Sequence, residues 1–266
     1  MPAGTVNVRI AGVDVDKFKG EPDKLKELNL RFREDYRAGR TGLSCKRQDI
    51  PAGRLTPAGI VSYLNYACEY EIDPTSPDGL TQGEMACRRY IMEFYEYLKR
   101  NVDGMQNIEI ASIAPEIGFR DSRRIQGEYR LTKDDIEADR IFDDAIVRYP
   151  RIYDMLAPDG NMKGNGSLEG EGYEGHIYVP IEEDRSYLIP FRCLLPVKIS
   201  NLMVAGRCLS ADHIAESSLR AISACMLTGQ AAGTAAGMAG KGGIKPAEVN
   251  IHGLQDSLKK QGVDLP

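Results

Sequence analysis

Hydrophobic and polar residues alternate in the first part of the chain, and this pattern predicts a β-strand over residues 5–15. Residues 21–40 carry apolar side chains at helical spacing, with Pro22 near the start and a glycine near the end, and they predict a helix. The segment 55–70 is rich in tyrosine and aliphatic residues and predicts strands of an antiparallel sheet.

Two further segments predict helices with defined starts. Residues 80–101 have a wide apolar stripe, and Thr81 with Glu84 three positions later has the spacing of a capping box. Residues 132–147 predict a second helix, which begins at Thr132 with an aspartate at the matching position.

The middle of the chain predicts more strands. Residues 107–119 and then 123–132 suggest a strand pair, and 176–181 and 186–196 suggest strands on either side of a polar turn. The glycine-rich stretch 157–175 predicts an exposed loop. No regular alternation of strand and helix runs through the chain, so the fold class is α/β with α+β character rather than a complete doubly wound domain.

Composition and charge argue against several classes of function. The 266 residues have a formal net charge of −5 and a pI near 5.4, without a basic stripe, so a general nucleic-acid binder is not expected. The six cysteines form no C-x-x-C pair, which favours free thiols in a reducing cytoplasm. Residues 221–240 carry no charge but few large aliphatic side chains, and they predict a buried helix rather than a membrane span.

A strand, a turn and a helix are predicted near the end of the chain. Residues 201–206 predict a buried strand that Gly206 closes, and Ser217 or Ser218 is expected to cap a helix that begins near Leu219. The first N–H groups of such a helix have no partner within it, so an anion suits that position.

The same predicted helix has a face with almost no side chains. Cys225, Gly229, Gly233 and Gly237 recur every four residues. A glycine inside a helix costs about 1 kcal/mol relative to alanine. Another helix, a sheet or a cofactor is therefore expected to approach this face closely.

Several blocks of the sequence, in order, resemble a family of bacterial FAD-dependent oxidoreductases. The blocks are 201–236, 189–196 and 119–136, with "RIAGVDVD" near the start and "VNIHGLQDSLKKQGVDL" at the end. The flavoprotein subunits of fumarate reductase and succinate dehydrogenase are distant relatives of this family. The resemblance implies a substrate-side domain over 1–195, with 1–20 assigned either to it or to the FAD domain. It implies that 196–266 is the C-terminal part of a Rossmann-like FAD-binding domain.

The resemblance also implies a set of site residues. Those placed against FAD are Gly206, Arg207, Cys208, Ser210, Ser218, Leu219, Arg220, Gly229 and Gln230. His213 is implied either to contact the flavin or to transfer a proton, and histidine titrates near neutrality. Arg123 and Arg192 are implied to hold a substrate carboxylate in a bidentate pair. The alternative for Arg123 is a purely structural role, in an ion pair with a nearby acidic residue.

One departure from the family pattern is large. Family members begin with a strand and a glycine-rich turn for the FAD pyrophosphate, and no such motif precedes Gly206 here. We therefore expect the ADP half of the site to come from a separate chain or to have been lost by gene splitting or truncation. We also expect an oligomer that acts on a small-molecule substrate in the cytoplasm. A catalytically silent subunit without FAD, or a different ligand in the retained pocket, are the alternatives.

Overall fold

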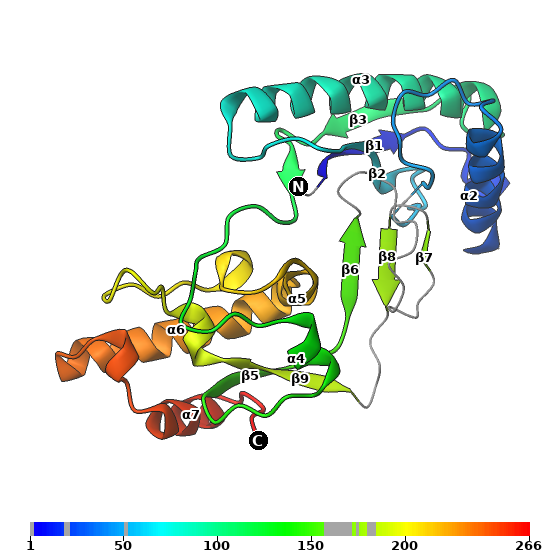
Figure 1. The fold of residues 1–266 in the computed structure, drawn as a ribbon. Coiled ribbons are helices and arrows are strands. Elements are labelled where there is room, and N and C mark those ends of the chain that lie inside the picture. The colour runs from blue at the N-terminus through cyan, green and yellow to red at the C-terminus, as the bar shows by residue number, and fades with distance from the viewer. Residues whose placement is uncertain (1–2, 19–21, 51–52, 157–171, 174–175, 180–184) are drawn as a thin grey trace. The chain divides into compact units, whose positions relative to one another are not determined.

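The computed structural model describes residues 3–18, 22–50, 53–156, 172–173, 176–179 and 185–266. The chain divides into two compact units, Met1–Phe119 with Leu156–Gly164 and Arg120–Met155 with Asn165–Pro266 (Figure 1). Helices are mixed with antiparallel sheets, which confirms the predicted α/β class. None of the helices in the described ranges is long and apolar enough to cross a membrane. The loop predicted over 157–175 falls outside the described residues, except for 172–173.

The first unit is built on an antiparallel sheet with strand order β2-β1-β3, and β4 also pairs with β1 (Figure 1). The long helix α3 packs against β1 and β2. The elements of this unit are β1 (Gly4–Ala11), α1 (Val15–Phe18), α2 (Pro22–Arg37), β2 (Val61–Glu69), α3 (Pro77–Asn101), β3 (Glu109–Ile113) and β4 (Gly118–Phe119). The predicted helix over 21–40 is confirmed as α2. The strand predicted over 5–15 is confirmed only up to Ala11, since Val15 begins α1. Within 55–70 the predicted strand is confirmed as β2, and Leu55 forms an isolated bridge to Val61.

An aromatic cluster joins the helices of the first unit to its sheet. The rings of Tyr66 on β2 and Phe94 on α3 stack with centroids 4.0 Å apart, and Phe32 on α2 meets both edge-on. All three side chains are fully buried. Aromatic pairs of this kind add about 0.5–1.5 kcal/mol beyond the burial of their area.

Helix α3 begins earlier than its sequence predicts. The N-cap is Ser76, whose hydroxyl accepts from the Gly79 N–H, and Pro77 follows as the first helical residue. Thr81 lies inside the helix and donates to the Pro77 carbonyl, so the predicted cap at Thr81 was wrong. Glu84 instead accepts from the backbone N–H of Ile117. Ser76 and Thr81 are both suitable N-cap residues and lie five positions apart. The helix starts at Ser76, which precedes a proline.

The second unit surrounds the antiparallel pair β5–β9, on which α6 and α7 pack (Figure 1). Its helices are α4 (Lys133–Glu137), α5 (His213–Leu219), α6 (Ile222–Gly242) and α7 (Ile251–Lys260). Its strands are β5 (Ala145–Pro150), β6 (Tyr153–Leu156), β7 (Gly172–Tyr173), β8 (His176–Val179) and β9 (Ser186–Pro190). The short 3-10 helices are η1 (Phe191–Leu194), η2 (Gly206–Cys208) and η3 (Pro246–Glu248).

The helix predicted over 132–147 is much shorter. The capping box at Thr132 and Asp135 is confirmed, but α4 ends at Glu137. Asp139 then takes a left-handed backbone conformation with φ of 47°, which a continuing helix cannot include. From Ala145 the chain is the strand β5, whose β-branched residues pair with β9.

The strand predicted over 201–206 was also wrong. Residues 202–205 have no regular secondary structure, and Gly206 starts η2. Among the described backbone hydrogen bonds, this stretch has one from the Val204 N–H to the Leu194 carbonyl. An apolar segment becomes a strand only where a neighbouring strand provides repeated backbone hydrogen bonds. Residues 202–205 have no such neighbour among the described residues.

Two other predicted strands are partly wrong. Within 186–196, the strand ends at Pro190 and the chain continues as η1. Within 123–132, the described pairing consists of isolated bridges at Gly127 and Leu131. Both segments instead form a network of single backbone bonds with one another, including Glu128 N–H to the Leu195 carbonyl.

Candidate functional site

The short helix α5 places His213 as its first residue. Its N-cap is Asp212, which accepts from the backbone N–H of Ala215 at 2.7 Å. The second oxygen of Asp212 accepts from the Lys133 N–H at 2.9 Å, so the same carboxylate fixes α5 to the start of α4. The predicted caps, Ser217 and Ser218, lie buried inside α5 rather than before a helix, so that prediction was wrong. Helix α5 is capped instead by Asp212, the residue before His213.

His213 forms a close pair with Asp121. Its Nδ1 lies 2.9 Å from Oδ2 of Asp121, and the Arg124 guanidinium donates to the same oxygen. Burial alone would raise the pKa of Asp121, but the hydrogen bond from His213 and the charge of Arg124 outweigh it and hold this pKa below its usual range. An ionised carboxylate at Nδ1 fixes the tautomer in which Nδ1 carries the proton and Nε2 is free to accept one.

The His213 side chain is 41% exposed, whereas the Asp121 side chain is 6% exposed. A half-exposed imidazole on a buried carboxylate can meet a small molecule while its orientation stays fixed. This pairing has the geometry of a general base with an orienting group.

Glu216 adds a buried acid to this cluster. The residue is 2% exposed, and its Oε1 has no hydrogen-bond partner among the described residues. Burial, with the nearby charge of Asp121, raises the pKa of Glu216 to about 8, against the opposing effect of Arg220, Arg124 and Arg207. The group is therefore mostly protonated at neutral pH.

Arg220, which the sequence placed against FAD, is the C-cap of α5 and is largely buried. Its guanidinium donates to the backbone carbonyl of Asp154 and lies 3.7 Å from the carboxylate of the same residue. Burial lowers the pKa of Arg220. In this arrangement Arg220 ties α5 to β6, and its proposed contact with FAD stays a prediction.

The turn at Gly206 is tied to the long helix α6. Gly206 has φ of 74°, which favours glycine, and its N–H donates to the Thr228 hydroxyl at 3.1 Å. Of the other residues implied in this turn, Ser210 is buried and its N–H donates to the Cys193 carbonyl, while Cys208 is exposed. The turn therefore presents its backbone at the beginning of α6.

The glycine face of α6 packs against nothing in the described part of the chain. A Cβ built on Gly229, Gly233 or Gly237 would meet no atom within 4 Å. The helix packs through its alanine-rich face instead, which buries Ala224, Thr228, Ala231, Ala235 and Ala239. No helix or sheet of the described ranges therefore approaches Gly229, and Gln230 bonds to Gln261 of α7. The implied contact of both residues with FAD stays a prediction.

The two arginines implied in substrate binding are not brought together with His213 by any described contact. Arg192 forms a bidentate pair with Asp144, with distances of 2.9 and 3.1 Å, and lies over the Tyr129 ring. Arg123 is exposed next to the cluster residue Arg124. A role of either arginine in binding a carboxylate stays a prediction.

Sequence reasoning missed Asp121 and Glu216 as site residues. Asp121 is the acid within the arginine-rich block "RDSRR", where it looks like a simple ion-pair partner. Glu216 follows His213 by three residues, a spacing that puts both on one helical face. The spacing could have indicated Glu216 as a neighbour of His213, but only if the helix had been predicted to start at His213 rather than near Leu219.

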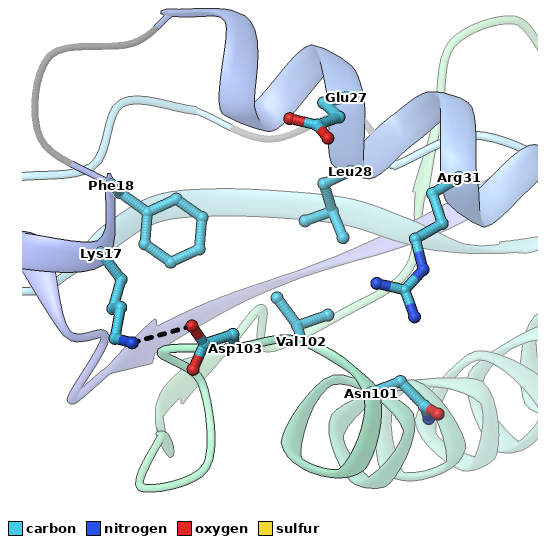
Figure 2. Close-up of a pocket in the computed structure, with 8 residues that line it drawn as sticks. All are labelled: Lys17, Phe18, Glu27, Leu28, Arg31, Asn101, Val102 and Asp103. Carbon is cyan, nitrogen blue, oxygen red and sulfur yellow. Dashed lines mark ion pairs between the residues drawn. The ribbon is translucent and has the colours of Figure 1, made fainter.

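A separate shallow pocket of about 240 Å³ lies in the first unit between α1, α2 and the end of α3 (Figure 2). Phe18, Leu28 and Val102 form its apolar part, and Lys17 pairs with Asp103 at 2.9 Å on its rim. None of the site residues implied by the sequence lines it.

Comparison with known proteins identifies the family of the chain. A family model described as FAD dependent oxidoreductase matches residues 3–258. No curated protein and no solved structure matches the chain. The family match covers nearly all of the 266 residues. The chain therefore belongs to the FAD-dependent oxidoreductase family, whose cofactor is FAD.

Proposed function

We propose that the second unit forms the proton-transfer side of a flavin site that acts on a small organic substrate. The observation that carries this proposal is the pair of His213 and Asp121, with Nδ1 engaged and the imidazole half-exposed. Oxidation of a C–H bond next to a hydroxyl or amine releases a hydride and a proton, so such a site needs a group for the proton.

The residues of the second unit fit a flavin. The N-cap of α6, Ala221, makes no side-chain capping bond, and the following Ile222 is exposed. The free N–H groups of this first turn suit a carbonyl edge with partial negative charge. Gly206 brings backbone close to the same helix. When bound, FAD accepts or returns the hydride.

The chain's own residues then have separate roles. Asp121 holds the Nδ1 proton of His213, and Arg124 helps to keep Asp121 ionised. Nε2 of His213 takes the substrate proton in the oxidative direction and returns it in the reductive direction. Arg220 fixes the end of α5 to β6 and so holds the helix that carries His213.

We further propose that the FAD pyrophosphate is bound by residues outside these 266, on the same or on another polypeptide. The support is that the sequence contains no glycine-rich pyrophosphate motif, and that the glycine face of α6 is open to an approaching element. An oligomer or a complex would cover such an open face.

The visible spectrum of the purified chain, with added FAD and then with candidate partner chains, tests this proposal. Bound flavin gives a yellow protein, and we expect uptake to depend on the segment that supplies the pyrophosphate motif. A chain that stays colourless under all these conditions is the silent subunit that the sequence left as an alternative.

A further inference from the structure

His213 and Glu216 lie three residues apart on α5. Side chains at this spacing are neighbours on the helix surface, with Cβ atoms about 5–6 Å apart. Asp121 comes from the loop between β4 and α4, where it bonds to His213, and its charge also acts on Glu216. Asp121 therefore acts on both His213 and Glu216, which share one face of α5.

The charged groups that act on Glu216 come from three segments. They are Asp121 and Arg124 on the loop before α4, Arg207 in η2 and Arg220 on α5 itself. The nearest described cation is 3.9 Å away, from Arg220 Nε to Glu216 Oε2, which is too long for a hydrogen bond. Arg124 is already paired with Asp121.

No strong partner therefore compensates the burial of Glu216 within the described residues. A buried carboxyl without a hydrogen-bonded cation favours its neutral form. The unpartnered Oε1 agrees with this, since a neutral carboxyl tolerates a missing donor better than a carboxylate does.

We propose that Glu216 is a positioning residue that keeps His213 in its neutral, proton-accepting form by remaining protonated itself. An ionised Glu216 would place a second negative charge beside His213, next to that of Asp121. Two carboxylates would stabilise the imidazolium ion, which cannot accept a proton from substrate. This inference rests on the proposed role of His213 in proton transfer.

The coupling of the two groups is measurable without flavin. The test is an NMR titration of the histidine ring signals in the full chain from pH 5 to about 9.5, with the signal of His213 identified by its loss in His213→Ala. Since the pKa of Glu216 is raised to about 8, the His213 signal is expected to show a second inflection near that pH. The sequence has three histidines, so the assignment is simple.

Glu216→Gln keeps the size of the side chain and removes its titration. This variant is expected to lose the second inflection, whereas the matched control Glu128→Gln, at an exposed position of the same unit, keeps it. An inflection that persists in Glu216→Gln, or that is absent from the wild-type chain, would overturn the inference. If Glu216→Gln does not fold, titration of ¹³C-labelled glutamate carboxyls in the wild-type chain decides: no carboxyl titrating above pH 7 overturns it.

A second measurement separates this inference from the proposed function. In the flavin-loaded enzyme, Glu216→Gln is expected to change the pH profile of kcat at alkaline pH and to leave KM nearly unchanged. If the NMR coupling is present but His213→Ala keeps full turnover, the proposed function fails and the coupling stands. If His213→Ala loses turnover but the coupling is absent, Glu216 has no such role.

Discussion

His213 Nδ1 lies 2.9 Å from Asp121 Oδ2, although 92 positions separate the two residues in the sequence. The pair joins the loop before α4 to the first residue of α5, and Arg124 donates to the same carboxylate oxygen. The carboxylate is buried and the imidazole is half-exposed. This relationship turns a histidine on a short helix into an oriented base.

Asp121→Asn tests the orienting role directly. The amide keeps the size of the side chain but presents no charge to His213 and allows the wrong tautomer. We expect kcat of the flavin-loaded enzyme to fall by roughly 10²-fold or more, with flavin content unchanged. Asp134→Asn, at an exposed position of α4, is the matched control and should keep full activity. Equal activity of the two variants would remove Asp121 from the mechanism.

The stability of the second unit should depend on pH through Glu216. Its pKa is raised to about 8 by burial, so its contribution to stability is full below the unfolded pKa and is lost as pH rises through the folded value. Between about pH 4.5 and 8, the free energy of unfolding should fall by about 1.4 kcal/mol per pH unit from this one group.

Urea unfolding followed by circular dichroism at a series of pH values measures this slope. Glu216→Gln should flatten it, and Glu128→Gln should not. The chain has two units, which can unfold in separate transitions. The comparison therefore uses the transition of the unit that contains Glu216, identified as the one that Glu216→Gln shifts. A slope that is the same in all three proteins would show that Glu216 ionises freely.

Substitution by alanine should have opposite effects on stability at two glycines of the second unit. Gly206→Ala forces a side chain into the left-handed region and should destabilise the unit by about 1–2 kcal/mol. The Cβ itself meets Cys225 Sγ at an ordinary distance of 3.6 Å, so the cost is in the backbone. Gly229→Ala lies in an exposed helix interior and should stabilise the isolated chain by about 0.5–1 kcal/mol. Thermal unfolding of both variants checks the signs.

The open face of α6 should matter for flavin uptake. A Cβ at Gly233 would meet no atom within 4 Å and the position is exposed, so the isolated Gly233→Leu protein should fold as before. The larger side chain would block any element that packs on this face, and FAD uptake with the pyrophosphate-binding segment present should be lost. Unchanged uptake by Gly233→Leu would show that the face stays in solvent.

Much of the first unit could be predicted because its signals are local. The alternation in β1 and the helical spacing in α2 depend on residues close in sequence. The start of α3 was misplaced because Ser76 and Thr81 offer competing caps, and only packing decides between them.

The second unit was harder for a physical reason. Residues 201–206 have the composition of a strand, but a strand needs a partner. Among the described backbone hydrogen bonds, this stretch has one to η1, from the Val204 N–H to the Leu194 carbonyl. The pair of Asp121 and His213 depends on a contact across the fold, so no spacing rule finds it. The resemblance to FAD-dependent oxidoreductases supplied the family and pointed to His213, while its orienting carboxylate emerged only from the structure.

Turnover of His213→Ala, normalised to bound flavin, tests the central claim most directly. The matched control is His252→Ala, at an exposed position on α7. The proposed mechanism predicts a loss in kcat of roughly 10²–10⁴-fold for His213→Ala, with the flavin content and the spectrum retained. Turnover equal to that of His252→Ala and the wild-type enzyme would contradict it.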